Sequence, residues 1–283
     1  MTHGALVPEG GSLRGLFTSG VVDVMMERGL IFDYVNGVSA GALNAINYVS
    51  GQVGRSRDAS VSFIRDRRYI GLNNLLFHGG IFNFDFLFGI LAEELLPFDQ
   101  KAFDLSPQML ECVATSCETG RAEFFRRGAC ADYMMASRAS ASMPLLAKEV
   151  LLNGKPYLDG GIALPIAYGR ALDCGYDKAV VVLTREQGYR KPPEEKLYAK
   201  MLDVRYADNV DLLHTLHRIP EHYNEMQEEM DELVRQGKLF LIRPSAPITM
   251  GKVERDPNEL EALYQRGRAD CEARWDALTE FLK

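Results

Sequence analysis

The stretch Asn36–Ala42, Asn-Gly-Val-Ser-Ala-Gly-Ala, joins a predicted strand to a predicted helix through one tight turn. Residues 32–35 are short and β-prone, whereas residues 42–49 carry apolar side chains at helical spacing. Between them lies Gly-x-Ser-x-Gly, the pattern of a nucleophile elbow, in which a strained strand-to-helix turn exposes a serine hydroxyl. The stretch therefore predicts Ser39 as a nucleophile.

Two glycines flank this serine, Gly37 and Gly41. The two arms of such a turn come close together, and residues without a Cβ permit that approach. The helix that follows points its N-terminus at the serine, so its free N–H groups favour negative charge there.

Composition limits the class of protein. The chain has 283 residues, of which 47% are apolar, enough for a full core. Its net charge is −7, and it has no Lys/Arg-rich run, which argues against nucleic-acid binding and against strong electrostatic attachment to an anionic membrane. Five scattered cysteines without CxxC spacing favour reduced thiols and no metal site or cofactor. No signal peptide or bilayer-spanning run is visible, so we expect a cytoplasmic, soluble protein.

Strands and helices alternate through the first two thirds of the chain. A strand at 4–7, a glycine loop, a helix at 16–28, a second strand and the elbow predict a parallel sheet with helices on both faces. Further strands are predicted at 109–115, 121–126 and 178–184, with a β-hairpin across Asn153-Gly154.

After Arg185 the composition changes, and residues 194–236 and 258–281 read as helices around one last strand at 238–242. We therefore expect a three-layer α/β/α fold with a mainly parallel central sheet. A catalytic core would occupy residues 1–185, and a mostly helical C-terminal extension, residues 186–283, would pack on it.

Two segments before the third strand are less regular. Residues 55–70 are predicted to form a charged surface helix. Residues 80–96 begin with alternating phenylalanines and continue with a helical pattern. This second segment either faces the core or forms an apolar wall or lid over an acyl-chain pocket.

An acyl-transfer site needs a nucleophile, a base and donors for the developing oxyanion. The loop Gly10-Gly11-Ser12 follows the first strand, which is expected beside the strand that carries Ser39. Its backbone N–H groups are candidates for an oxyanion hole. A nucleotide-phosphate loop is the alternative, but the GxGxxG spacing and the GK[ST] lysine are absent.

The base is either a histidine or an aspartate. His214, His217 and His222 lie in a charged helical stretch and have no obvious catalytic context, although a histidine-dependent esterase stays open. Asp159 ends the predicted hairpin and is followed by Gly160-Gly161, so its carboxylate is the better candidate. An ordinary polar turn is the alternative reading of that tripeptide.

In order and spacing, three motifs together resemble the patatin-like phospholipase family: Gly10–Gly15, Gly37–Gly41 and Asp159–Gly161. The block Ala139–Pro144 adds to the likeness, which covers about residues 4–185. The rest looks like the C-terminal extension of bacterial patatin-like proteins.

The resemblance implies a Ser–Asp dyad, here Ser39 and Asp159, that hydrolyses acyl esters or phospholipids without calcium. It implies an oxyanion hole at Gly10, Gly11 and Ser12, where Ser12 replaces the family's usual third glycine. Arg14 matches the family's basic position, and we interpret it as anchoring the loop. The motif positions that would support the site are Arg14, Gly15, Gly37, Gly41, Gly160 and Gly161.

The expected partner is a lipid or acyl-ester substrate, with transient contact at a membrane surface also allowed and no nucleic acid. A lipid- or acyl-binding module with a vestigial site remains the rival from another functional class. Oligomeric state, head group and chain length are not predicted.

Overall fold

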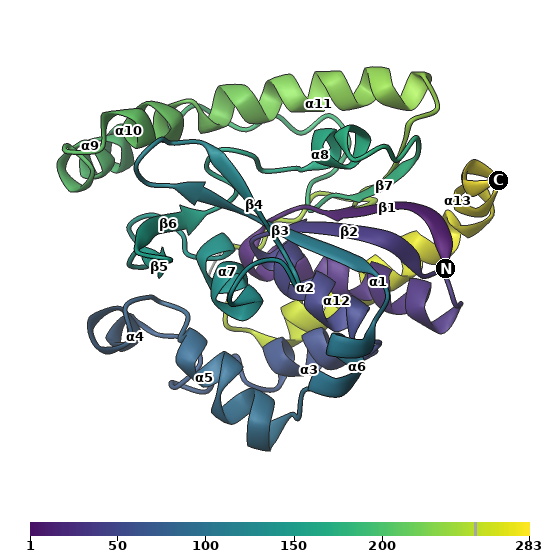
Figure 1. Cartoon of the computed structure of the whole chain (residues 1–283), viewed down its shortest axis with the longest axis horizontal. Coiled ribbons are helices and arrows are strands. Elements are labelled where there is room, and N and C mark those ends of the chain that lie inside the picture. Colours follow the sequence, from purple (N-terminus) through teal and green to yellow (C-terminus); the bar gives the residue numbers. More distant parts are fainter. Residues whose placement is uncertain (252–253) are drawn as a thin grey trace.

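A β-sheet with helices on both faces forms the centre of the molecule (Figure 1). The computed structural model describes residues 1–251 and 254–283. Within these residues the parallel strands follow the order β3-β2-β1-β7-β8, and β4, β5 and β6 pair antiparallel at one end. The strands are β1 Thr2–Pro8, β2 Phe32–Val38, β3 Met109–Ser116, β4 Ala122–Arg126, β5 Val150–Leu152, β6 Lys155–Asp159, β7 Ala179–Val182 and β8 Leu239–Ile242. The predicted α/β fold is confirmed, with a sheet that is parallel in its centre and mixed overall.

Side chains of the parallel strands alternate between two cores. In β7, Val180 and Val182 belong to one apolar cluster, and Ala179 and Val181 belong to the other. Because both faces of the strand are covered, its sequence is an unbroken apolar run rather than an alternation.

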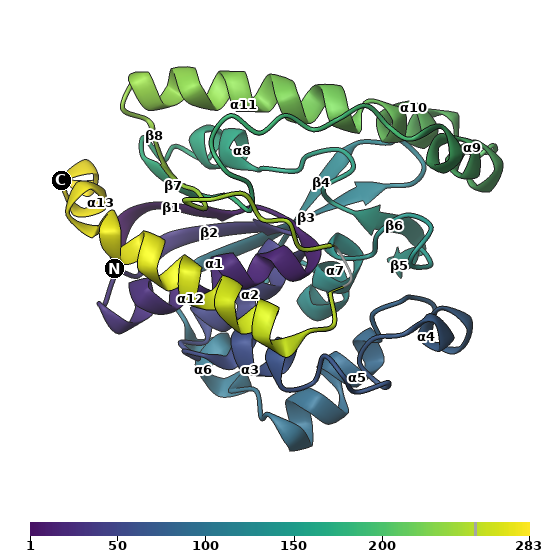
Figure 2. The same cartoon turned by 180° about the vertical axis from the view of Figure 1, so that it is seen from behind.

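The helices separate into layers on the two faces of the sheet (Figures 1 and 2). Residues of α1, α2, α7 and α12 join the first cluster, and residues of α8 and α11 join the second. The helical bounds are η1 Ser12–Arg14, α1 Gly15–Glu27, α2 Ala40–Val49, α3 Arg55–Val61, α4 Leu72–Phe77, α5 Phe84–Phe88, the π-helix η2 Leu91–Leu95, α6 Gln100–Leu105, α7 Tyr133–Ser140, α8 Tyr168–Asp173, α9 Lys196–Arg205, α10 Val210–His217, α11 Ile219–Arg235, α12 Pro257–Ala273 and α13 Trp275–Leu282.

The C-terminal part of the chain contributes to the central layers. Strand β8 pairs in parallel with β7, and α12 runs along α1 (Figure 2). The helices cross at two glycines: a Cβ on Gly267 would lie 2.0 Å from the carbonyl oxygen of Phe17, and one on Gly20 would lie 2.1 Å from that of Tyr264. The division at residue 185 stays a prediction, but a strand from beyond it belongs to the sheet.

Two predicted helices are shorter than their patterns indicated. Helix α3 ends at Val61, and the turns that follow place Ile64 and Tyr69 in the interior. The predicted helix over 258–281 is interrupted at Arg274, and α13 then brings the ring of Phe281 to 5.6 Å from that of Phe240 in β8. In both cases burial of aromatic or aliphatic side chains outweighs a continued helix.

No helix in the described part of the chain is both long and apolar enough to cross a bilayer. The segment between α2 and β3 instead carries the short helices α3 to α6, which lie outside the α1–α2 layer in Figure 1. Residues 80–96 form no strand; they contain α5 and the π-helix η2.

Candidate active site

Ser39 lies at the apex of the turn between β2 and α2. Its backbone has φ 55° and ψ −123°, a strained conformation typical of a nucleophile elbow. The flanking glycines are required by close approach: a Cβ on Gly37 would lie 2.5 Å from the carbonyl oxygen of Gly41, and one on Gly41 would lie 2.2 Å from that of Pro8. Any side chain at either position would force the turn open.

Asp159 is brought to the serine because β2 and β6 pair with consecutive parts of the same edge of β3. Val113 pairs with Val38 of β2, and the next residue, Ala114, pairs with Asp159 of β6. Strand β4 pairs with both Val113 and Ala114, so it occupies the opposite edge of β3. Strands β2 and β6 therefore meet end to end along one edge, and the Ser39 hydroxyl donates a hydrogen bond of 2.8 Å to Asp159 Oδ2.

The backbone and side chain of Asp159 are held from several sides. Its Oδ1 accepts the N–H of Gly161 at 2.8 Å, and its carbonyl oxygen accepts the hydroxyl of Thr115 at 2.8 Å. Its own N–H donates to the carbonyl oxygen of Ser142. Asp159 is 6% exposed and Ser39 is 7% exposed, so the contact between them is shielded from bulk water while the aspartate cannot rotate freely.

The glycine loop after β1 contacts the serine directly. A Cβ on Gly10 would lie 3.0 Å from the Cβ of Ser39. Among the described residues, the N–H groups of Gly10 and Gly11 donate no hydrogen bond, which leaves them available to a ligand oxygen. Ser12, where the family usually has glycine, adopts φ 53°, in the left-handed region that glycine tolerates best. The substitution therefore keeps the backbone path and adds local strain.

Arg14 and Gly15 connect this loop to the elbow. A Cβ on Gly15 would lie 2.8 Å from that of Ala40, so the starts of α1 and α2 are in close contact. Burial lowers the pKa of Arg14, nearby Arg185 lowers it further, and Glu9 opposes both. The Nε of Arg14 has no hydrogen-bond partner among residues 1–251 and 254–283, whereas its backbone N–H donates to the carbonyl oxygen of Gly11 at 3.1 Å.

A cavity of about 520 Å³ opens beside Ser39 and is lined mainly by apolar side chains. Ser12, Leu13 and Ala40 line it together with Ser39. Residues from 80–96 also line it, namely Phe82, Phe84, Leu87, Phe88, Ala92 and Glu93. The segment faces the interior and also forms part of the cavity wall, because Phe84 is buried and lines the cavity.

The histidines lie elsewhere. His217 binds Glu194 and Asp203 at 2.7 and 2.9 Å, and His222 lies 3.6 Å from Glu225. None of the five histidines lines the cavity formed by the described residues. Among the residues that the structure describes, Ser39 thus has a carboxylate partner and no imidazole partner.

Comparison with known proteins agrees with these observations. Residues 6–169 match the model of the patatin-like phospholipase family. The chain belongs to this family. Membership supports a lipid esterase or phospholipase activity in general terms. Residues 209–283 of this patatin-like chain match a domain of unknown function, DUF6363.

Two relatives extend beyond the family match. The patatin-like chain is 27% identical over 252 residues to the uncharacterized protein YjjU of Escherichia coli K12, covering 86% of this chain and 69% of YjjU. Its fold is similar to the crystal structure of VipD from Legionella pneumophila, with a TM-score of 0.51 and 14% identity. That likeness covers 98% of this chain and 67% of VipD and concerns the fold alone.

Three supporting residues of the patatin-like site were not predicted individually. Ser140 Oγ accepts the N–H of Ser39 at 2.9 Å, and Thr115 bonds to Asp159. The block 139–144 signalled the first, but no local pattern distinguishes Thr115. Tyr198 of α9 packs in the apolar cluster that contains Leu158 and Ile162, on either side of Asp159, and burial, the largest effect, raises its pKa to about 12. A helix from beyond residue 185 therefore packs against the segment that carries Asp159.

Proposed function

We propose that this chain is a serine acyl hydrolase that cleaves carboxylic esters of lipids through Ser39 and Asp159. The observation that carries the proposal is the 2.8 Å hydrogen bond from the Ser39 hydroxyl to Asp159 Oδ2, beside a largely apolar cavity. A lone carboxylate at this distance is within reach of the proton that the nucleophile must lose.

Four steps follow from this geometry. Ser39 Oγ attacks the ester carbonyl carbon while its proton passes to Asp159, and the carbonyl oxygen becomes an oxyanion. The free N–H groups of Gly10 and Gly11 donate to that oxyanion. The tetrahedral intermediate then expels the alcohol, which takes the proton from Asp159, leaving an acyl ester on Ser39. Water gives a proton to Asp159 and attacks this ester, and the free acid leaves as Ser39 regains the proton.

The cavity supports an ester with an apolar acyl chain. Its volume is typical of sites for small ligands, and most of the residues that line it are apolar. An acyl chain in the cavity would place its carbonyl beside the serine and the glycine loop, because Ser39 and Ser12 both line the cavity and Gly10 lies against Ser39.

A fluorophosphonate probe and a p-nitrophenyl ester test the proposal. The wild-type chain should be labelled once, Ser39→Ala should lose labelling and hydrolysis, and Asp159→Asn should reduce kcat by about 10²- to 10⁴-fold. Exposed Ser245→Ala and Asp208→Asn are matched controls that should retain full activity. Full turnover by Ser39→Ala would refute the proposal.

The same assay separates the rivals. A histidine-dependent esterase requires that His214→Gln, His217→Gln or His222→Gln lose activity, and we expect all three to be labelled normally. An acyl-binding protein with a vestigial site would bind fatty acid without reacting with the probe.

A further inference from the structure

Helix α4, Leu72–Phe77, exposes three of its four large apolar side chains and buries a polar one. Leu72, Leu76 and Phe77 are 76%, 74% and 79% exposed, whereas Asn74 between them is buried. The Asn74 amide lies within 3.5 Å of the backbone carbonyl oxygen of Ile81. A surface helix ordinarily turns its apolar stripe inward. This one presents three large apolar side chains to the surroundings, and we call these three residues the α4 tip.

The α4 tip is joined to the cavity beside Ser39. The excursion that carries it leaves at Tyr69 and returns at Phe82, and both of these residues line the cavity. Its two stems are tied together: Ile70 and Phe82 form a β-bridge, and the N–H of Asn83 donates to the carbonyl oxygen of Tyr69. In both views α4 lies at an outer corner of the molecule, at the end of the segment that also contains α5 (Figures 1 and 2).

Cationic side chains occur in the segments that flank the tip, although the whole chain has a net charge of −7. Arg65, Arg67 and Lys148 are exposed, and none of them forms an ion pair with an acidic side chain of the described residues. The chain at Lys148 lies against the excursion, because its N–H bonds to the carbonyl oxygen of Gly79. Arg68 is already engaged by Asp66.

We infer that the α4 tip is a docking surface for an anionic lipid interface, with Leu72, Leu76 and Phe77 entering the apolar boundary and Arg65, Arg67 and Lys148 meeting lipid phosphates. Exposed apolar side chains with unpaired cations in the flanking segments are the complement of such an interface. The inference rests on the proposed function in one respect: docking there would serve to bring lipid to the cavity beside Ser39. The docking itself is independent of catalysis.

Sedimentation with vesicles of ether-linked lipids, which contain no ester to cleave, measures docking alone. The wild-type chain should bind vesicles that contain phosphatidylglycerol, bind phosphatidylcholine vesicles more weakly, and be released by salt. The double variant Leu76→Ser/Phe77→Ser should lose about tenfold or more in binding. Replacing Arg65 and Arg67 by glutamine should cost about fivefold for each arginine.

The matched control removes two apolar side chains of similar exposure elsewhere, Leu105→Ser/Val204→Ser, and should bind as the wild type does. All variants should hydrolyse a soluble ester at the wild-type rate, so loss of docking is distinguishable from loss of chemistry. Absence of wild-type binding, or equal loss in the control, would overturn the inference. So would light scattering that shows the tip variant dissociating a dimer while vesicle binding stays unchanged.

Discussion

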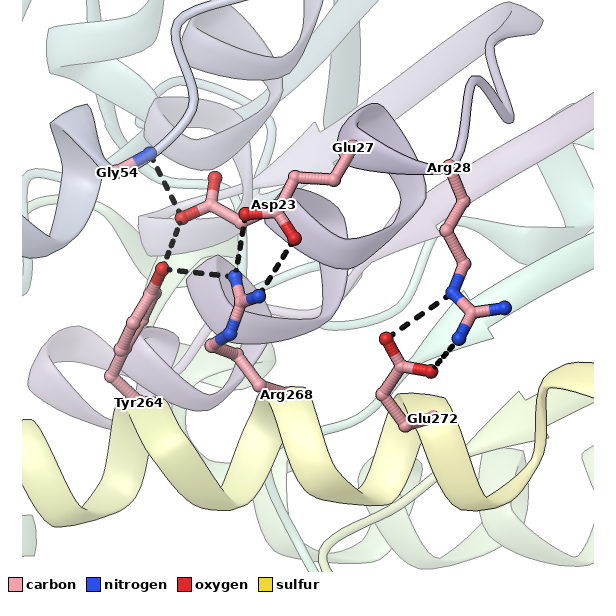
Figure 3. A network of polar contacts seen from close by, with 7 residues as sticks. All are labelled: Asp23, Glu27, Arg28, Gly54, Tyr264, Arg268 and Glu272. Atoms are coloured by element: carbon pink, nitrogen blue, oxygen red, sulfur yellow. Dashed lines mark hydrogen bonds and ion pairs between the residues drawn. The ribbon is translucent and has the colours of Figure 1, made fainter.

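Replacing Asp23 by asparagine should make the stability of the chain less dependent on pH. Asp23 lies on α1 at the contact with α12, and its Oδ2 accepts the Tyr264 hydroxyl at 2.8 Å and the N–H of Gly54 at 3.0 Å (Figure 3). Arg268 of α12 pairs with Glu27 close by. Burial, the largest effect, raises the pKa of Asp23 from 3.8 to about 6 despite these donors.

The raised pKa of Asp23 decides whether stability rises or falls with pH. Between pH 3.8 and about 6 the folded chain holds a proton on Asp23 that the unfolded chain has lost, so raising the pH through this range destabilises the fold. At 1.36 kcal/mol for each pKa unit, the full effect is about 3 kcal/mol, of which about 2 kcal/mol falls between pH 4 and pH 7. Asparagine can offer one amide oxygen to both donors without this cost.

Urea unfolding of the wild type and Asp23→Asn at pH 4, 5, 6 and 7 gives the free energy of unfolding for each. The variant should gain about 2 kcal/mol relative to the wild type as the pH rises from 4 to 7. Taking the difference between the two proteins cancels the titration of other groups, and exposed Asp208→Asn is the control that should show no such gain. A difference that stays constant with pH would refute the reasoning.

Three further predictions concern packing, charge and a buried hydroxyl. Gly267→Ala should destabilise the fold by about 3 kcal/mol or more, because its Cβ would lie 2.0 Å from the carbonyl oxygen of Phe17. Gly169→Ala, which has open space at its Cβ, is the control and should be tolerated. Equal melting temperatures for the two variants would contradict this prediction. The carboxylates of Glu194 and Asp203 raise the pKa of His217 above 6.5, so the charged imidazole should stabilise the fold fully below pH 6.5 and lose this effect at higher pH. His217→Gln should therefore lower the free energy of unfolding more at acidic pH than at alkaline pH. A larger loss at high pH would contradict the prediction. Tyr48→Phe removes the hydroxyl that accepts the N–H of Phe32 and donates to the carbonyl oxygen of Leu30. The free energy of unfolding in urea should fall by about 1–3 kcal/mol, and an unchanged midpoint would argue against this.

Local patterns were sufficient to predict the elements that position the candidate nucleophile. The strand, turn and helix around Ser39 are each encoded within a few residues, and glycine marks the close approach. Asp159 was predicted as its partner because a hairpin turn and two glycines delimit it. The roles of both in catalysis remain predictions, and the structure adds that their side chains touch.

Other features depend on contacts between distant segments and have no local signal. The shared edge of β3 follows from the register of β2 and β6, which no short pattern sets. Helix α4 was not predicted, and the exposure of Leu72 and Leu76 depends on where the segment lies in the fold. The break at Arg274 likewise depends on where Phe281 can find an aromatic neighbour in β8.

The shared edge of β3 also affects how a protein of this design can diverge. The spacing between Ser39 and Asp159 is set by backbone pairing along one strand, while residues 50–108 form a long connection from α2 to β3. This connection supplies much of the cavity wall. Insertions, deletions and substitutions can accumulate within it without altering the distance between these two side chains. The lining of the cavity can thus change during evolution while the pairing of Ser39 with Asp159 is kept.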